Sequence, residues 1–188
     1  GLDHIIAKKA IDNIHSKGGK ITAFESYHGT FVAETNEPNP LQMKLSESAS
    51  EMLSWGRHNN RHLAQGRLQH IPWFRLFERA VPVKIQGEER FVAIPEGDSL
   101  YYRKIYNLNE AHTVVKGKLM RNETARIWNI LVKLGMTDSS LKIDMAGERC
   151  AEEVINSLLP YSPADSLEQR LMDYTGAEAS DIDTLKWL

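Results

Sequence analysis

The 188-residue chain has a single cysteine, Cys150, and no long apolar run. One cysteine rules out an internal disulfide and a zinc site built from several cysteines. No stretch approaches the roughly 18 apolar residues that a membrane span needs. The first residues, GLDHIIAKKAIDN, mix acid and lysines with apolar side chains, unlike a signal peptide. These absences predict a cytoplasmic protein with no membrane partner.

The sequence also lacks the short motifs that carry common chemistry. It contains no phosphate-cradling G-x-x-x-x-G-K-[ST], no dinucleotide-binding G-x-G-x-x-G and no nucleophile elbow G-x-S-x-G. We therefore expect no cofactor and favour a protein that is not an enzyme. A metal-dependent hydrolase or nuclease remains an alternative, because scattered acids can meet in the fold to form such a site.

The composition, 41% hydrophobic and 26% charged, is typical of a globular protein. The length suffices for one full hydrophobic core. Pro160 and Pro163 mark a boundary, so the prediction is a single domain over residues 1–160 and a helical appendage over 161–188. Basic residues predominate up to about residue 135 and acidic residues after it.

Apolar residues at helical spacing predict five helices, over residues 3–17, 48–71, 122–134, 146–159 and about 162–175. The second of these begins with a capping box, in which Ser48 and Glu51 stand three residues apart. The fourth places Cys150 on its apolar stripe, which predicts a small buried side chain.

Alternating apolar residues predict strands. A short hairpin is expected around Gly29, and a three-stranded antiparallel meander over residues 81–85, 91–94 and 100–106. The predicted fold class is therefore α+β, with a small antiparallel sheet of about three to five strands packed by four or five helices.

The segment from Trp55 to Ala80 concentrates arginine and aromatic residues, with Glu78 as its single acid. Arginine suits phosphate because its planar guanidinium forms two parallel hydrogen bonds, and aromatic rings stack on unpaired bases. The predicted nucleic-acid-binding residues, including three from a later basic stretch, are Arg57, Arg61, Arg67, Trp73, Arg75, Arg79, Lys116, Lys118 and Arg121. The alternative is that the aromatic rings anchor the core and the arginine stems lie over them.

His58 and His62 stand four residues apart, which places both imidazoles on one face if the helix is continuous. Glu51 points in nearly the same direction, so these three residues are weak candidates for a metal site. Asn59 stands where an H-E-x-x-H motif has its glutamate. We therefore predict no metal.

The leading hypothesis is a non-enzymatic, nucleic-acid-associated accessory or regulatory protein that binds the phosphate backbone, for example of DNA, through the basic and aromatic residues. The first alternative is a protein–protein adaptor that uses exposed aromatic residues or the acidic C-terminal helices to hold a protein partner. The metal-dependent hydrolase or nuclease is the second.

Overall fold

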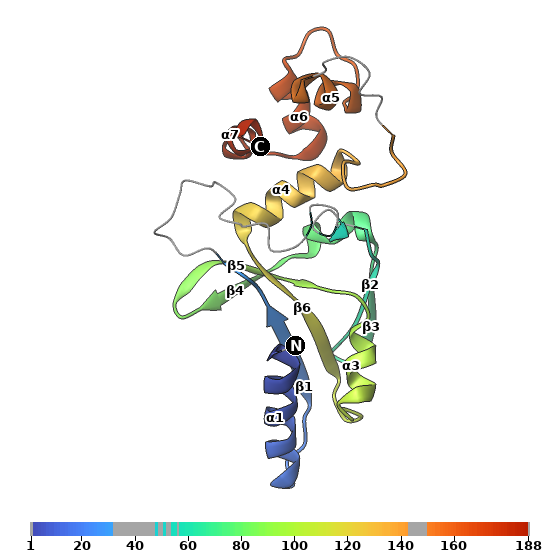
Figure 1. Cartoon of the computed structure of the whole chain (residues 1–188), viewed down its shortest axis with the longest axis vertical. Helices are drawn as coiled ribbons and strands as arrows, with labels where there is room; N and C mark the ends of the chain where they lie inside the picture. The colour runs from blue at the N-terminus through green and yellow to red at the C-terminus, as the bar shows by residue number, and fades with distance from the viewer. Residues whose placement is uncertain are drawn as a thin grey trace. The chain divides into compact units, whose positions relative to one another are not determined.

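The computed structural model describes residues 2–31, 48, 51, 54–55, 57–142 and 150–187 (Figure 1). Its contacts divide the chain into two units. The first, here called the sheet unit, comprises Gly1–Phe31 and His58–Asn122. The second, the helical unit, comprises Val32–Arg57 and Glu123–Leu188. The boundary predicted after Pro160 is a different division, and it stays a prediction.

The sheet unit is built on six strands, which are β1 (Ala23–His28), β2 (Asn60–Ala64), β3 (Arg67–Ile71), β4 (Val81–Ile85), β5 (Glu88–Pro95) and β6 (Thr113–Arg121). They form one sheet in the order β3-β2-β6-β5-β4, and β1 pairs with β6 outside that path. Neighbours along the path are antiparallel, whereas β1 runs parallel to β6.

Strand β6 is the centre of this sheet. It pairs with β1 from Thr113 to Lys118, with β5 from Gly117 to Arg121, and with β2 at Val114. At Gly117 a side-chain Cβ would collide with the Ile94 carbonyl of β5, so the close approach of these strands requires glycine.

Two helices, α1 (Leu2–Ser16) and α3 (Ser99–Ile105), pack against the sheet. Helix α1 lies beside β1 and α3 beside β6 and β2 (Figure 1). Between them lies an apolar core whose buried members are Ile11, Ile21, Leu63, Tyr106, Leu108, Ala111 and Val114. Asp98 caps α3 by accepting a hydrogen bond from the Leu100 amide.

The helical unit contains α4 (Asn122–Lys133, whose first residue belongs to the sheet unit), α5 (Ala151–Leu158), α6 (Leu167–Thr175) and α7 (Ala179–Trp187). These helices share a second core cluster, whose buried members are Ile127, Ile130, Leu134, Leu159, Leu171 and Ile182. The last two of these residues come from the stretch that was predicted to be an appendage. Ser166 caps α6, and Gly176 ends it in the left-handed conformation, with φ of 75°.

The predicted α+β class is confirmed, with β1 as a parallel exception in an otherwise antiparallel sheet. The helices predicted at 3–17, 122–134 and 162–175 are present. The capping box is also present: the Ser48 hydroxyl accepts from the Glu51 amide, and the Glu51 carboxylate accepts from the Ser48 amide.

The helix predicted over 48–71 is wrong beyond its first turns. Residues 60–71 instead form the β2–β3 hairpin, whose turn has positive φ at Gln65 (48°) and Gly66 (77°). Such a two-residue turn matches strand twist, and no helix accommodates it. The third meander strand is also wrong, because residues 99–105 form α3. The true third strand is β6.

Two smaller predictions also need correction. Cys150 is exposed and not buried, and α5 begins one residue after it; the earlier part of that predicted helix, 146–149, lies outside the described residues. In the hairpin predicted around Gly29, the first strand pairs with distant β6, and residues 32–47 lie outside the described part.

Among the helices that the structure describes, none combines the length and apolar character that crossing a membrane requires.

Candidate active-site groove

Two lysines of β6, Lys116 and Lys118, lie two residues apart and therefore on the same face of the sheet as buried Val114. Lys116 is only 7% exposed. Its ammonium lies 3.4 Å from the Asp3 carboxylate of α1 and 5.4 Å from the centre of the Tyr102 ring of α3. A buried lysine needs such partners to remain charged.

Asp3 belongs to a polar cluster at the start of α1. Burial alone would raise the pKa of its carboxyl group, but hydrogen bonds, one of them from Lys116, and the charges of Lys116 and His4 lower it to about 2. His4 stacks on Tyr102, and its Nδ1 lies 2.7 Å from the Tyr106 hydroxyl. The cluster thus holds Asp3 as a carboxylate beside a lysine.

A second polar cluster surrounds Lys118. Its ammonium lies 3.4 Å from the Glu96 carboxylate, and that carboxylate lies 3.9 Å from Nε2 of His28. His28 is the register partner of Lys118 across the parallel β1–β6 pair. Its Nδ1 is buried and has no hydrogen-bond partner among the described residues. One hydrogen-bonding atom of the imidazole is therefore unused within the described residues.

Between α1 and β1 runs a groove of about 920 Å³. Its polar lining includes Asp3, Ser26 and His28, and its apolar wall comes from α1 through Ile6, Ala10 and Ile14, among others. An acid, an imidazole and two nearby lysines are suited to bind carboxylates and to move a proton. We take this groove as the candidate active site.

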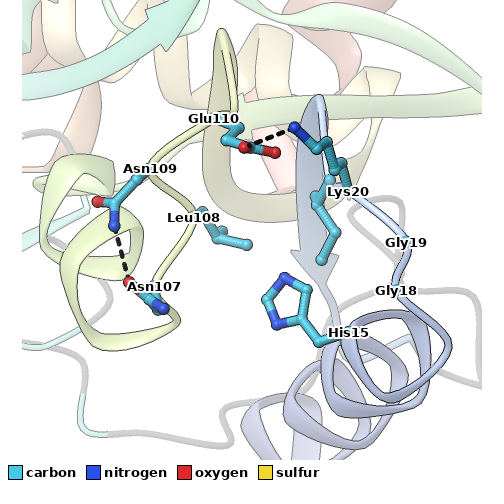
Figure 2. Close-up of a pocket in the computed structure, with 9 residues that line it drawn as sticks. His15, Gly18, Gly19, Lys20, Asn107, Leu108, Asn109 and Glu110 are labelled. Carbon is cyan, nitrogen blue, oxygen red and sulfur yellow. Dashed lines mark hydrogen bonds and ion pairs between the residues drawn. The ribbon is translucent and has the colours of Figure 1, made fainter.

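A smaller pocket of about 540 Å³ lies where α1 and α3 end (Figure 2). Its ionisable lining includes His15, and a 3.0 Å ion pair joins Lys20 to Glu110. Both partners of that pair are exposed, so water satisfies their charges. The pocket therefore gives less reason than the groove to expect a specific ligand.

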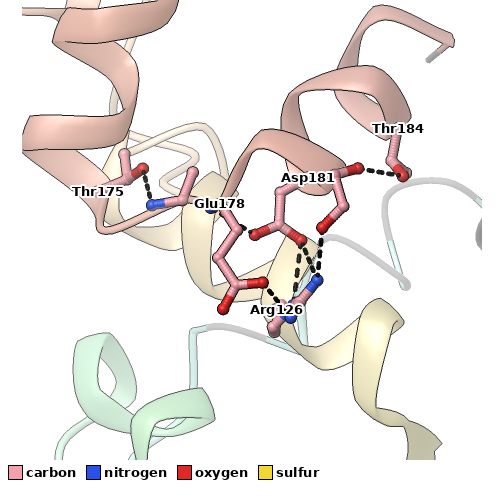
Figure 3. Close-up of polar contacts among 7 residues, drawn as sticks. Arg126, Thr175, Glu178, Asp181 and Thr184 are labelled. Atoms are coloured by element: carbon pink, nitrogen blue, oxygen red, sulfur yellow. Dashed lines mark hydrogen bonds and ion pairs between the residues drawn. The ribbon is translucent and has the colours of Figure 1, made fainter.

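The helical unit contains a charged network that is closed on itself (Figure 3). Arg126 donates to Asp181 at 3.0 Å, to Glu178 at 2.8 Å and to the Ser180 hydroxyl at 3.1 Å. Asp181, only 4% exposed, also accepts from the Glu178 amide. Since each charge already has its partner, the network fits a structural role that ties α7 to α4.

The predicted nucleic-acid residues do not form one basic surface. Arg57 lies in the helical unit and donates to the Thr137 carbonyl, whereas the other eight residues lie in the sheet unit. Arg61 pairs with Asp98, and Arg75 pairs with Glu78.

Lys116 and Lys118 pair with the acids described above, Arg121 is buried over the Phe91 ring, and Trp73 packs edge-on against Phe74. Arg67 and Arg79 are exposed. Much of the positive charge counted from the sequence is therefore already neutralised or buried.

The hypothesis of a metal site depended on a continuous helix through His58 and His62, but residues 60–64 form strand β2. His62 lies on β2 and not on a helix, and burial lowers its pKa. Within the described ranges, no three histidine, cysteine, aspartate or glutamate residues converge on one point.

The site residues predicted from the sequence did not include Asp3, Glu96 and His28. One available signal was the alternation in VVKGKLM, residues 114–120, which is typical of a strand and puts two lysines on one face. Their acidic partners come from distant elements, which no local pattern reveals.

Comparison with known proteins identifies a family. The family model for the saccharopine dehydrogenase C-terminal domain matches residues 1–185. The saccharopine dehydrogenase [NADP(+), L-glutamate-forming] of Schizosaccharomyces pombe is 30% identical over 97% of this chain and 38% of its own length. The Saccharomyces cerevisiae enzyme of that name is 30% identical over 98% of the chain, again 38% of its length.

A solved structure gives the same result. The apo, L-Glu-forming saccharopine dehydrogenase from Saccharomyces cerevisiae superposes with a TM-score of 0.81 at 26% identity, covering 98% of this chain and 42% of that one. The chain thus spans about two-fifths of the length of these yeast relatives.

These findings overturn the predicted function. The matched family and its named relatives are metabolic enzymes, so the prediction of a DNA-binding or other nucleic-acid-associated regulatory protein with a nucleic-acid partner is wrong. The physical reason lies in the residues themselves, because most of the basic side chains already have carboxylate or aromatic neighbours within the fold.

Proposed function

The chain belongs to the saccharopine dehydrogenase C-terminal domain family, and on that basis we propose that it is the substrate-binding part of an NADP-dependent oxidoreductase that acts on saccharopine. The observation that carries the proposal is the family match over residues 1–185. Because the chain spans about two-fifths of its yeast relatives, the complete reaction is proposed for an enzyme in which this chain is one part.

The chemistry of the named product supports the groove as the substrate site. A substrate that yields L-glutamate carries the two carboxyl groups of glutamate, which are ionised at neutral pH. Lys118, the register partner of the groove-lining His28, offers an ammonium for one of them. In this proposal the substrate carboxylate shares that ammonium with Glu96, as charge-assisted hydrogen bonds allow.

His28 is the residue we propose for proton transfer. A nitrogen that departs as an amine must take up a proton, which an imidazole can donate. Its Nδ1 has no hydrogen-bond partner in the part of the chain described, and the side chain lines the groove. Asp3, held ionised by Lys116, supplies a fixed negative charge in the same groove.

The residues of this chain do not fit an NADP site. The 188-residue sequence contains no G-x-G-x-x-G turn, which is the usual means of holding a dinucleotide pyrophosphate at a helix N-terminus. We therefore assign the NADP(+) of the relatives' names to another part of the enzyme, and we derive no step through it.

The cytoplasm is the proposed compartment. The single cysteine supports it. The mouse relative's name includes the word mitochondrial, so immunofluorescence of the native protein decides between the two compartments.

Calorimetric titration of the purified chain with saccharopine tests the substrate assignment. We expect saccharopine to bind more tightly than L-lysine, which lacks the glutamate carboxylates. A hydrogen bond to a charged group contributes about 1.5–3 kcal/mol, so Lys118→Met should weaken saccharopine binding about 10- to 100-fold.

The matched control is Lys84→Met. Lys84 also pairs with a glutamate, Glu89 at 2.9 Å, but it lies on β4, whereas Lys118 lies on β6 as the register partner of the groove-lining His28. Its substitution should leave the saccharopine dissociation constant unchanged. Equal weakening by both substitutions, or no detectable binding by the unsubstituted chain, contradicts the proposal.

A further inference from the structure

The pocket where α1 and α3 end has two walls, each made by a loop (Figure 2). One loop leads from α1 into β1, and the other leads from α3 into β6. Every residue that lines the pocket belongs to the sheet unit. Its volume of about 540 Å³ is in the usual range for a small-ligand site.

The wall of residues 107–110 is held in position by the chain itself. The Arg103 guanidinium donates to the Asn109 carbonyl at 2.8 Å and to the Leu108 carbonyl at 3.4 Å. The Asn109 side-chain amide donates to the Asn107 side-chain oxygen at 2.8 Å. Asn107 has a left-handed φ of 54°, a conformation that clusters at ligand sites. A wall ordered in advance binds a ligand at a smaller cost in conformational entropy.

The facing wall leaves room for a ligand. Gly18, just past the end of α1, has a φ of 72°, and a Cβ added there would meet no atom within 4 Å. The His15 ring faces the loop of Asn107 across the cavity (Figure 2). The space between the two loops is therefore bordered by polar side chains and left open by a glycine.

Opposite charges from the two walls lie side by side. The Lys20 ammonium of the first loop lies 3.0 Å from the Glu110 carboxylate of the second (Figure 2). Because these side chains are 73% and 54% exposed, water competes for both charges and their mutual attraction is weak. A ligand with an ammonium and a carboxylate can replace this pair at little cost and give each protein charge an opposite partner.

The remaining lining favours a ligand side chain that is polar but uncharged. Asn107 retains its amide NH₂ group and Asn109 its amide oxygen, and neither group has another hydrogen-bond partner among the described residues. Leu108 and Ile21, which are 2% and 9% exposed, supply the apolar part of the lining. These groups suit a short aliphatic chain that ends in an amide.

We propose that this pocket binds a free α-amino acid with a neutral polar side chain, represented by L-glutamine. An α-amino acid carries both an ammonium and a carboxylate at neutral pH. Lys20 receives the carboxylate, Glu110 receives the ammonium, and the amides of Asn107 and Asn109 bond to the amide of the ligand. The inference goes beyond the proposed function, because it assigns a second site that is separate from the groove.

A ligand in this pocket joins the two loops that lead into β1 and β6. The His112 amide already donates to the Thr22 carbonyl at 2.9 Å between these loops. A ligand that bridges Lys20 and Glu110 adds contacts that the unfolded chain does not offer. Binding should therefore raise the unfolding temperature of the chain.

The first experiment is calorimetric titration of the purified chain with L-glutamine, for which we expect a dissociation constant in the millimolar range. Two analogues each lack one charge: glutaramate has no α-ammonium, and L-glutamine α-amide has no carboxylate. Each should bind about tenfold more weakly, because one charged hydrogen bond is lost. Lys20→Met and Glu110→Gln should each weaken L-glutamine binding by a similar factor.

The matched controls are Lys84→Met and Glu89→Gln. These residues form an exposed pair at 2.9 Å outside the pocket, so their substitution should leave L-glutamine binding unchanged. Circular dichroism checks that each variant is folded, which the exposure of Lys20 and Glu110 leads us to expect. Equal weakening by the control substitutions, or equal binding of the two analogues, overturns the proposal.

The second experiment locates the ligand by nuclear magnetic resonance of the ¹⁵N-labelled chain. We expect L-glutamine to shift the amide signals of Gly18 and residues 107–110, and to leave those of Ser26 and His28 in the groove in place. Lys118→Met should not alter these shifts. Shifts centred on the groove, or no shift and no heat at tens of millimolar L-glutamine, overturn the proposal.

The saccharopine titration remains a separate test of the proposed function. A chain that binds L-glutamine at the loops but does not bind saccharopine refutes the substrate role and leaves this site in place. A chain that binds saccharopine but fails the L-glutamine experiments does the reverse. Saccharopine that displaces L-glutamine competitively shows one shared site and overturns the second site.

Discussion

The two units of the molecule arrange their charged side chains in different ways. In the helical unit, Arg126 has Asp181, Glu178 and Ser180 around it, and the network closes without any outside group. In the sheet unit, Lys118 and His28 share one carboxylate, and an imidazole nitrogen of His28 has no partner among the described residues. A closed network stabilises a fold, whereas an open one beside a groove can accept a ligand.

The largest expected effect comes from removing residues 161–188. Leu171 and Ile182 belong to the core cluster of the helical unit, and losing one such side chain typically costs about 2–5 kcal/mol. That loss is large against a total stability of about 5–15 kcal/mol. Calorimetry should therefore show no cooperative unfolding of α4 and α5, while saccharopine binding by the sheet unit persists.

A truncated chain that unfolds at the original temperature, with its helical signal intact apart from the deleted helices, contradicts this expectation. It would establish that the segment after Pro160 is the separable appendage predicted from the prolines.

The next effect is that of Arg126→Met, which opens the closed network and leaves Asp181 buried without its main partner. Breaking a buried ion pair on one side costs about 3–5 kcal/mol, so urea denaturation should show a clear loss of stability without any change in saccharopine binding. Lys186→Met is the control, because its pair with Glu168 is exposed and contributes less than about 1 kcal/mol. If both substitutions lower the free energy of unfolding equally, the buried pair of Arg126 contributes no more than the exposed pair of Lys186.

A smaller, pH-dependent effect belongs to the sheet unit. The pKa of Asp3 falls from 3.8 to about 2 in the folded chain. A depressed carboxyl pKa stabilises the fold above the unfolded value, and that stabilisation disappears as the pH drops from about 4 toward 2. Because water screens part of the interaction, we expect a loss of about 1 kcal/mol, measured by urea denaturation at several pH values.

Asp3→Asn should lower the stability at pH 7 and reduce the change in the free energy of unfolding between pH 4 and pH 2. Asp12→Asn is the control on the same helix, since Asp12 is exposed and pairs with Lys8 one turn away. If Asp12→Asn reduces that change as much as Asp3→Asn, the effect does not come from the cluster around Lys116.

The smallest effect is expected from the exposed arginines. Arg75 forms a surface pair with Glu78 at 3.1 Å, and such pairs contribute about 0–1 kcal/mol. The double substitution Arg75→Ala, Arg79→Ala should therefore change the free energy of unfolding by less than about 1 kcal/mol and leave saccharopine binding intact. A loss as large as that of Arg126→Met would mean that this segment supports the core.

The helical unit was the more predictable of the two from sequence. Its signals are local: Ile127, Ile130 and Leu134 recur at helical spacing, and Gly176 stands just past the end of α6. The capping box at Ser48 was equally predictable from the sequence, because its two residues lie within one helical turn.

The candidate site was not predictable in the same way. Asp3 and Lys116 are more than one hundred residues apart in sequence, and it is the β1–β6 pairing that places His28 beside Lys118. The capping box and the apolar spacing suggested a helix over residues 48–71, but the Gln65–Gly66 turn required a hairpin. Tertiary pairing overrode local pattern in these cases.

The parallel pairing of β1 with β6 has a consequence for how the chain folds. Ala23 cannot meet its register partner Thr113 until the four intervening strands, β2 to β5, and then β6 itself have been synthesised. Pairings so distant in sequence close slowly, because the intervening chain must first give up its conformational freedom. During that interval β1 lacks its sheet partner, and unpaired strand edges of this kind favour aggregation.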